Sequence, residues 1–186
     1  MDYTEKIKNY FEEEKRILDS VDLDDLNAFM NMLEETRKAG HRVFICGNGG
    51  SGSTASHFAC DYTKGVNYYA GLNYDFECLN DNIPTMLAVA NDISYEDVFV
   101  YPLRFKLHEG DMVIGISGSG NSENVLRAID YANSHGAKTF ALVGFDGGKL
   151  KKMAQRSIHI AVDNMQIVED LHMIIDHVTM YVFTHC

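Results

Sequence analysis

Hydrophobic positions in the first forty residues repeat with the period of an α-helix. One face of a first amphipathic helix carries Ile7, Tyr10, Phe11, Ile17 and Leu18. The stretch "LDDLNAFMNMLEETRKAG" keeps the same period and stops at Gly40, a residue type that commonly closes helices. The pattern therefore predicts two helices over 1–40, ahead of the first strand.

From residue 42 onward, short apolar runs alternate with helical stretches. The runs "RVFIC" (42–46), "DMVIGI" (111–116), "AKTFALVG" (137–144) and "SIHIAV" (157–162) are typical of strands buried in a parallel sheet. Helices are expected from about Ser53 to Lys64, over 122–136, and from about Gln166 to the C-terminus. This alternation predicts an α/β fold, with helices on both faces of a mostly parallel sheet.

The middle of the chain, 66–110, has a less regular pattern. "NYDFECLN" is a candidate strand, whereas "PTMLAVAND" and "YEDVFVYPLRFKL" have helical periodicity, the second strained by Pro102. No linker or change of composition interrupts the 186 residues. We therefore expect a single domain over 1–186, in which the helices of 1–40 serve packing and oligomerisation.

Composition and charge narrow the class of protein. The chain is 46% hydrophobic with a formal net charge of −11, which disfavours binding to nucleic-acid phosphates. No apolar run reaches the roughly 20 residues of a membrane span, and the charged N-terminus is unlike a secretory signal. Cys46, Cys60, Cys78 and Cys186 form no CxxC pair and are expected as reduced thiols. These features predict a cytoplasmic protein with neither nucleic acid nor membrane as a partner.

Two loops rich in serine and glycine each connect a predicted strand to a predicted helix. They are "CGNGGSGSTASHF" (46–58) and "SGSGNS" (117–122). Such loops lie where open α/β sheets bind ligands, beside helix N-termini that attract anions. Neither has the spacing of a Walker A or a GxGxxG motif. Serine and glycine also form ordinary turns and N-caps, but two such loops on one sheet favour a phosphate pocket.

Candidate acid–base residues lie in two places. His57 and Asp61 are four residues apart, so they share a helix face beside the first loop. On the last helix the expected apolar face is Leu171, Ile174, Ile175, Val178, Tyr181 and Val182. The remaining arc carries Glu169, His172, Asp176 and His177. From the pattern alone, we expect His172 and Asp176 to form a solvated or subunit-facing pair.

The motifs together resemble a known family. "GNGGSGSTASHF", "ANDISYED", "SGSGNSENVLRAI" and "FDGG", followed by a last helix with histidines, are similar to the sugar isomerase (SIS) domain and, within it, to the phosphoheptose isomerases. The resemblance covers nearly the whole chain. It implies a three-layer SIS domain with an N-terminal helical extension, assembled as a homotetramer with active sites at subunit interfaces.

The resemblance also implies roles for individual residues. Ser51, Ser117, Ser119 and Ser122 would contact a phosphorylated sugar, within a site that includes Asn48, Gly49, Gly50, Gly118 and Glu169. Asp61 would be the general base, and His177, supplied by a neighbouring subunit, the opposing acid/base. Asp92 would bind sugar hydroxyls or orient a catalytic group.

Some members of this family bind zinc at the positions of His57, Asp61, Glu169 and His177, which would give one ion per site. Imidazole and carboxylate groups suit zinc. However, Glu169 and His177 are eight residues apart, about 12 Å along a helix axis. Both side chains would have to reach toward the ion, and a hydrogen-bonded cluster without metal is the alternative.

Four positions depart from the family pattern and leave the identity of the sugar open. Asp61 stands where glutamate is usual, Glu169 where glutamine is usual, and Gly118 where threonine is common. Lys64, in "DYTKG", is expected to supply the cation that arginine provides elsewhere, as a point charge.

The leading functional hypothesis is isomerisation of sedoheptulose 7-phosphate to D-glycero-D-manno-heptose 7-phosphate through an enediol, serving lipopolysaccharide or capsule heptose synthesis. Two alternatives are a non-catalytic SIS protein, acting as a sugar-phosphate sensor or as an adaptor for a replication initiator, and an isomerase of another sugar phosphate. The presence of His57, an acid at 61 and His177 favours the enzyme.

Overall fold

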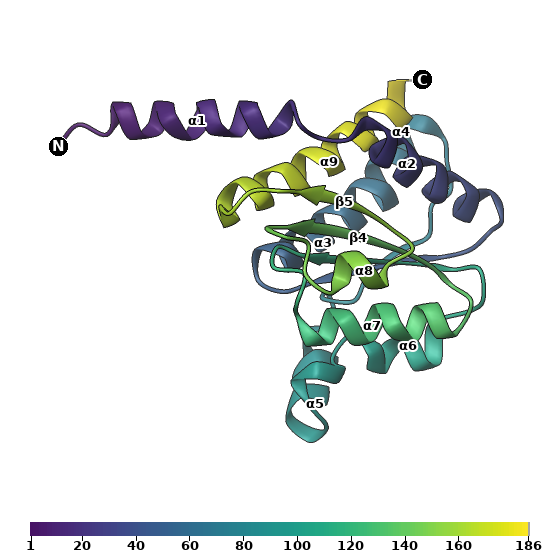
Figure 1. The fold of residues 1–186 in the computed structure, drawn as a ribbon. Helices are drawn as coiled ribbons and strands as arrows, with labels where there is room; N and C mark the ends of the chain where they lie inside the picture. The colour runs from purple at the N-terminus through teal and green to yellow at the C-terminus, as the bar shows by residue number, and fades with distance from the viewer. Residues whose placement is uncertain (186) are drawn as a thin grey trace.

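The computed structural model describes residues 1–185, so Cys186 lies outside the described part. A five-stranded parallel sheet with strand order β2-β1-β3-β4-β5 forms the centre of the molecule (Figure 1). Its strands are β1 (Val43–Gly47), β2 (Phe76–Cys78), β3 (Met112–Ser117), β4 (Lys138–Gly144) and β5 (Arg156–Ile160). The predicted α/β class with a parallel sheet is confirmed, and each strand agrees with its expected range to within a few residues.

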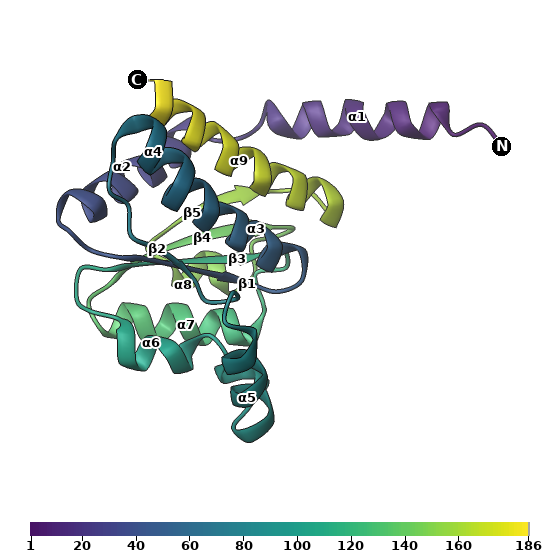
Figure 2. The same cartoon turned by 180° about the vertical axis from the view of Figure 1, so that it is seen from behind.

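Helices cover both faces of the sheet (Figures 1 and 2). One side holds α2 (Leu23–Lys38), α3 (Gly50–Cys60) and α9 (Met165–His185); the other holds α5 (Ile83–Asp92), α6 (Val100–Lys106), α7 (Glu123–Ser134) and α8 (Leu150–Met153). Successive strand residues point to opposite faces. Ile45, Ile114 and Leu142 therefore enter the core beneath α2, α3 and α9. Phe44, Val113 and Val143 enter the core beneath α7.

The helix after the first Ser/Gly loop is longer than predicted. It begins at Gly50 and continues beyond α3 through a π-helical segment, η1 (Asp61–Val66), into α4 (Asn67–Ala70). Gly49 caps its start with φ 54°, and Gly71 ends it with φ 65°. The limits of the continuous helix are thus set by two glycines with positive φ, a conformation for which glycine is suited. Periodicity had placed these limits at Ser53 and Lys64.

The expected strain at Pro102 is absent from the structure. A short 3-10 turn, η2 (Tyr95–Asp97), precedes α6, which starts at Val100 and places Pro102 in its first turn. The first backbone N–H groups of a helix have no intrahelical acceptor, so proline removes no hydrogen bond there.

The predicted apolar face of the last helix is only partly confirmed: Leu171 and Ile175 are buried and Ile174 packs against the core, but the buried face extends in another direction. The side chains that α9 buries are Ile167, Val168, Leu171, His172, Ile175, Asp176 and Thr179. Tyr181, expected on that face, is 61% exposed. The buried positions recur every three or four residues, but polar residues at 172, 176 and 179 conceal the stripe from a hydrophobicity pattern. The expectation of a solvated or subunit-facing pair is therefore also wrong, because His172 and Asp176 face the protein interior.

The N-terminal helix α1 (Thr4–Leu18) extends away from the body of the protein (Figures 1 and 2). It is joined to the core by the buried side chain of Ile17 and by a hydrogen bond from the Tyr10 hydroxyl to Asp170. Ile7 and Phe11 are 54% and 52% exposed. The predicted apolar face exists, and most of it stays uncovered by the described part of this chain.

Two further expectations can be compared with the described residues. Within 1–185, none of the helices combines the length and the apolar character that a membrane crossing requires. Cys46, Cys60 and Cys78 are free thiols, the first and last of them buried and Cys60 exposed.

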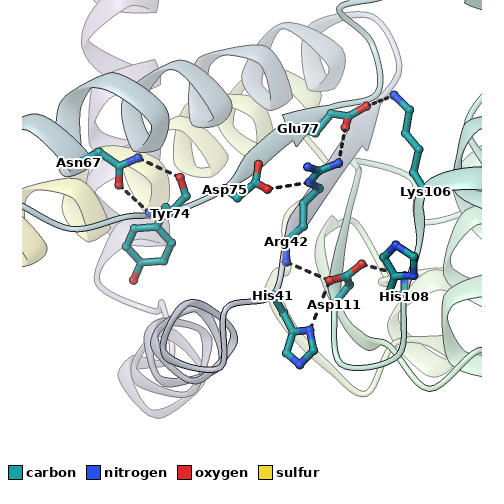
Figure 3. Close-up of polar contacts among 9 residues, drawn as sticks. All are labelled: His41, Arg42, Asn67, Tyr74, Asp75, Glu77, Lys106, His108 and Asp111. Atoms are coloured by element: carbon teal, nitrogen blue, oxygen red, sulfur yellow. Dashed lines mark hydrogen bonds and ion pairs between the residues drawn. The ribbon is translucent and has the colours of Figure 1, made fainter.

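A polar network ties together the N-terminal ends of β1, β2 and β3 (Figure 3). The buried carboxylate of Asp111 accepts hydrogen bonds from the backbone N–H groups of Arg42 at 2.9 Å and His108 at 2.8 Å. The Arg42 guanidinium donates to Asp75 at 2.9 Å and to Glu77 at 3.3 Å. The network aligns the three strands at the end of the sheet opposite the Ser/Gly loops.

Replacing Asp111 should lower the free energy of unfolding measurably. Asp111→Ala leaves two buried backbone donors without an acceptor, so we expect a loss of about 2–3 kcal/mol in urea denaturation. The matched control is Asp75→Ala, which removes a carboxylate whose side chain is 59% exposed and should cost less than about 1 kcal/mol. Equal losses for the two variants, at equal protomer concentration, would contradict this account of the network.

His172 gives the fold a dependence on pH. The side chain is 1% exposed and neither ring nitrogen makes a hydrogen bond within the described residues. Burial lowers the pKa of His172 to about 4, while a weak contact with the Val143 backbone acts in the opposite direction. The native imidazole therefore stays neutral at pH values where the imidazole of the unfolded chain takes up a proton.

Because the pKa of His172 is lower in the folded state, its contribution to stability is complete above about pH 6.5 and is lost as the pH falls toward 4. At pH 5 this linkage amounts to about 2 kcal/mol. We expect the difference in unfolding free energy between the wild type and His172→Gln, measured in chelator, to change by that amount between pH 7.5 and 5. Parallel pH profiles for the two proteins would show that His172 does not carry this dependence.

Candidate active site

The two Ser/Gly loops lie side by side at the carboxyl ends of β1 and β3, which are neighbours in the sheet. They enclose a pocket of about 170 Å³. The pocket is lined by Asn48, Ser51, Ile116, Ser117, Gly118, Ser119, Ser122, Met165 and Glu169. The four serines predicted from the sequence are thus brought together, next to the N-termini of α3 and α7. Backbone N–H groups and the helix dipoles make this position favourable for an anion.

Close packing fixes the shape of both loops. A Cβ on Gly47 would lie 2.7 Å from the backbone of Ser51, so only glycine permits this turn into α3. In the second loop, the Ser117 hydroxyl lies 3.1 Å from that of Ser122 and accepts a hydrogen bond from the backbone of Gly120 at 3.2 Å. These contacts hold the serine hydroxyls in place around the pocket.

Three polar residues that the sequence interpretation missed support the first loop. The side-chain amide of Asn80 accepts from the Gly47 N–H at 3.2 Å and donates to the Gly47 carbonyl at 2.8 Å. Asn124 and Asn48 exchange two hydrogen bonds of 2.9 Å, and the Tyr95 hydroxyl donates to Asn48 at 2.9 Å. Asn124 and Tyr95 belong to the quoted motifs, whereas nothing in the pattern around Asn80 indicated its role.

Glu169 and Met165, on the first turns of α9, complete the pocket. A Cβ on Gly50 would lie 2.5 Å from the Glu169 carboxylate oxygens, so this carboxylate sits directly over the start of α3. A Cβ on Gly118 would lie 2.5 Å from the Met165 sulfur. The methionine therefore fills the space that a threonine at position 118 would need, which gives a physical reason for that departure from the family pattern.

A second group of side chains gathers between α3 and α9. His57 Nε2 lies 3.1 Å from His177 Nε2 and 3.5 Å from Asp61 Oδ2. With the carboxylate of Asp176, one ligand atom from each of these four residues falls within 4.8 Å of all the others. Imidazole and carboxylate groups at such distances can hold a divalent cation. We call His57, Asp61, Asp176 and His177 the His/Asp cluster.

The composition of this cluster differs from the expected ligand set in one residue. Three of the four predicted ligands are present, but Asp176 takes part and Glu169 does not. Asp176 is buried, and burial, together with the nearby Asp61, raises its pKa to about 8 when no metal is bound. Sequence interpretation missed Asp176 because it was assigned to the outer arc of the last helix.

Contacts between η1 and α9 bring the cluster together. The buried hydroxyl of Tyr62 donates to Thr179 at 2.8 Å, and Gly65 lies so close to Met180 that a Cβ there would come within 2.5 Å of the methionine methyl. The π-helical segment begins at Asp61, and such segments alter the direction of the side chains around them. His57 and His177 consequently meet within one chain, although the family resemblance implied a histidine from a neighbouring subunit.

Two predicted substrate-binding residues do not reach the pocket in this structure. The Lys64 ammonium lies 3.4 Å from the Tyr69 hydroxyl and 4.7 Å from the centre of that ring. Asp92, at the end of α5, is exposed and accepts a hydrogen bond from Asn91. Neither residue lines the pocket of its own chain, so a contact of Lys64 with the phosphate and of Asp92 with the sugar stays a prediction.

Comparisons with known proteins identify the family of this chain. The SIS domain family model matches residues 9–144. The phosphoheptose isomerase of Helicobacter pylori strain P12 is 34% identical over 160 residues, covering 82% of this chain and 79% of that protein. The probable phosphoheptose isomerase of Thermoplasma acidophilum is 31% identical over 174 residues, covering 91% and 93%.

Solved structures share the fold over the full length of both chains. The phosphoheptose isomerase of Francisella tularensis has a TM-score of 0.88 at 25% identity. That of Neisseria gonorrhoeae has a TM-score of 0.90 at 24% identity. The chain therefore belongs to the SIS domain family and, within it, to the phosphoheptose isomerases, a group of phosphosugar isomerases.

Proposed function

We propose that this protein interconverts sedoheptulose 7-phosphate and D-glycero-D-manno-heptose 7-phosphate through an enediol. One observation carries the proposal: an anion pocket and a cluster of acid–base side chains share the helices α3 and α9. An aldose–ketose isomerase needs both, because it must hold a phosphorylated sugar and move a proton between two adjacent carbons. The relatives named above support the choice of a heptose.

In this proposal the two loops bind the phosphate. Ser51 and Ser117 are buried at the pocket wall, whereas Ser119 is exposed at its rim. Their hydroxyls, with the backbone of Gly49, Gly50 and Gly118, would donate to the phosphate oxygens at the positive ends of α3 and α7. Asn48 and Glu169 lie at the same pocket and would receive the sugar hydroxyls.

Proton transfer would be the task of the His/Asp cluster. Asp61 would take a proton from C1 of the ketose and return it to C2, and this transfer produces the aldose. His177 would donate a proton to O2 as the enediol forms and accept one from O1 as it collapses. His57 Nε2 lies 3.1 Å from His177 Nε2 and 3.5 Å from Asp61 Oδ2, so His57 would orient both side chains.

The donor set also supports a metal, for which we propose zinc. The fit rests on the two imidazole groups, the Asp61 carboxylate and the buried Asp176 carboxylate, which makes no hydrogen bond within the described residues. His57, Asp61 and His177 would hold the ion. When bound, zinc would polarise the oxygens at C1 and C2 as a Lewis acid.

We also propose a homotetramer, because α1 presents an apolar face that the described part of the chain leaves uncovered. Ile7 and Phe11 on this helix, and Tyr3 at its N-cap, are each more than half exposed. A second copy could cover them, and Lys64 and Asp92 would reach a sugar only if another subunit supplies them.

The reaction can be tested by proton NMR of the purified protein with sedoheptulose 7-phosphate in D2O, with and without zinc. We expect new aldose signals and deuterium at C2, since the transferred proton exchanges with solvent on Asp61. Binding without turnover would instead support a sugar-phosphate sensor, and turnover of a different sugar phosphate would move the substrate assignment.

Removing either proposed acid–base group should abolish most of the turnover. We expect Asp61→Asn and His177→Gln each to lower kcat by about 10²–10⁴-fold, the usual contribution of a general acid or base. His135→Gln, at an exposed histidine stacked on Tyr131, serves as the control and should leave kcat unchanged. Wild-type turnover in both site variants would remove this assignment.

The assembly is tested by light scattering. We expect the wild type to have the mass of four chains, and the double variant Ile7→Glu, Phe11→Glu to form smaller species, because charge replaces the apolar face of α1. Phe105→Glu, which also alters an exposed aromatic residue but lies on α6, away from α1, is the control. A monomeric wild type at working concentration would contradict the proposal.

A further inference from the structure

The unusual member of the His/Asp cluster is Asp176. We propose that Asp176 is a direct ligand of the divalent cation in this protein and takes the place expected for Glu169, which stays in the sugar-phosphate pocket. This inference rests on the metal of the proposed isomerase site, but it concerns how the chain binds that metal rather than which sugar it converts.

The first argument is the state of the Asp176 carboxylate. The residue is 0% exposed, and neither carboxylate oxygen has a hydrogen-bond partner within the described residues. A buried carboxylate without a partner is costly, whether it stays ionised or is forced to bind a proton. A cation held by the cluster would supply the missing interaction, since Asp176 lies within 4.8 Å of the other three ligand atoms.

The second argument is the spacing of the donors. Two ligands of a tetrahedral zinc ion, each about 2.0–2.1 Å from the metal, lie about 3.3 Å from one another. The two imidazole Nε2 atoms are 3.1 Å apart, and His57 Nε2 lies 3.5 Å from Asp61 Oδ2. Two Nε2 atoms that face each other suit a shared cation, because both lone pairs can then point to the same centre.

The third argument is the place of Glu169. It precedes Asp176 by seven residues, nearly two helical turns, or about 10 Å along the α9 axis. Its carboxylate lies over Gly50, at the start of α3, whereas Asp176 and His177 meet His57 at the end of α3 and Asp61, the first residue of η1. Glu169 can stay at the pocket only if another residue completes the metal site, and Asp176 is already there.

Binding of cobalt(II) to the full chain tests this inference. Cobalt reports its own ligands through visible absorption bands, so the readout does not depend on any sugar. We expect the metal-stripped wild type to bind one Co²⁺ per chain with the intense bands of a tetrahedral site. Asp176→Asn should bind at least about 100-fold more weakly with altered bands, and the matched variant Glu169→Gln should bind like the wild type.

A substitution that adds a signal guards against a folding defect in Asp176→Asn. In Asp176→Cys, a thiolate at the same position should give a sulfur-to-cobalt charge-transfer band in the near ultraviolet, which arises only by direct coordination. Circular dichroism and thermal unfolding without metal show whether each variant is folded.

The outcomes separate this inference from the proposed function. Wild-type cobalt binding by folded Asp176→Asn, loss of binding in Glu169→Gln, or a folded Asp176→Cys without the sulfur band would each overturn the role of Asp176. Absence of Co²⁺ binding by the wild type would do the same, yet heptose turnover would then leave the isomerase proposal intact. Conversely, an Asp176-dependent spectrum without heptose turnover would support the ligand and reject the substrate.

Discussion

The packing of α9 against α3 and η1 is the contact on which the rest of the site depends. The hydrogen bond from Tyr62 to Thr179 and the close approach of Gly65 to Met180 fix the distance between α9 and the continuous helix formed by α3 and η1. At this distance His57 and His177 touch, and Glu169 reaches the start of α3. Both halves of the site, the anion pocket and the His/Asp cluster, are therefore set by one interface between helices.

The two ends of the sheet have different tasks. At the carboxyl ends of β1 and β3, glycine turns leave hydroxyl groups and backbone donors facing a pocket. At the other end, Asp111 accepts a hydrogen bond from the Arg42 backbone, and the Arg42 guanidinium donates to Asp75 (Figure 3). The polar groups that hold the strands in register there have hydrogen-bond partners. Buried polar atoms without a hydrogen bond are costly in a protein interior. Those of His172 and Asp176 both lie on α9, which also lines the pocket, and this placement points to a functional role for the helix.

Burial of polar groups on α9 has a consequence for stability as well as for chemistry. His172 and Asp176 occupy positions of the buried stripe where an apolar residue would normally pack. Their desolvation moves the pKa of His172 downward and that of Asp176 upward, which favours the neutral form of each. A cation at Asp176 would change this balance, because it stabilises the ionised carboxylate.

Several features could be determined from the sequence by itself. The alternation of apolar runs and helical periods predicted the parallel sheet. The Ser/Gly loops after two strands predicted the pocket, because in a parallel α/β sheet all loops that lead from a strand to the next helix lie at the same end of the sheet. The spacing of His57 and Asp61 predicted a shared helix face. These are local properties of the chain.

Only the tertiary structure decided which face of the last helix is buried. Hydrophobicity alone placed His172 and Asp176 outside, whereas the packed structure places them inside, since burial depends on what lies opposite and not on the residue's own polarity. Packing also decided that the Glu169 carboxylate lies at Gly50 and that the Lys64 ammonium contacts Tyr69. Each side chain has several partners within reach along the sequence, and only the packing of distant helices selects one of them.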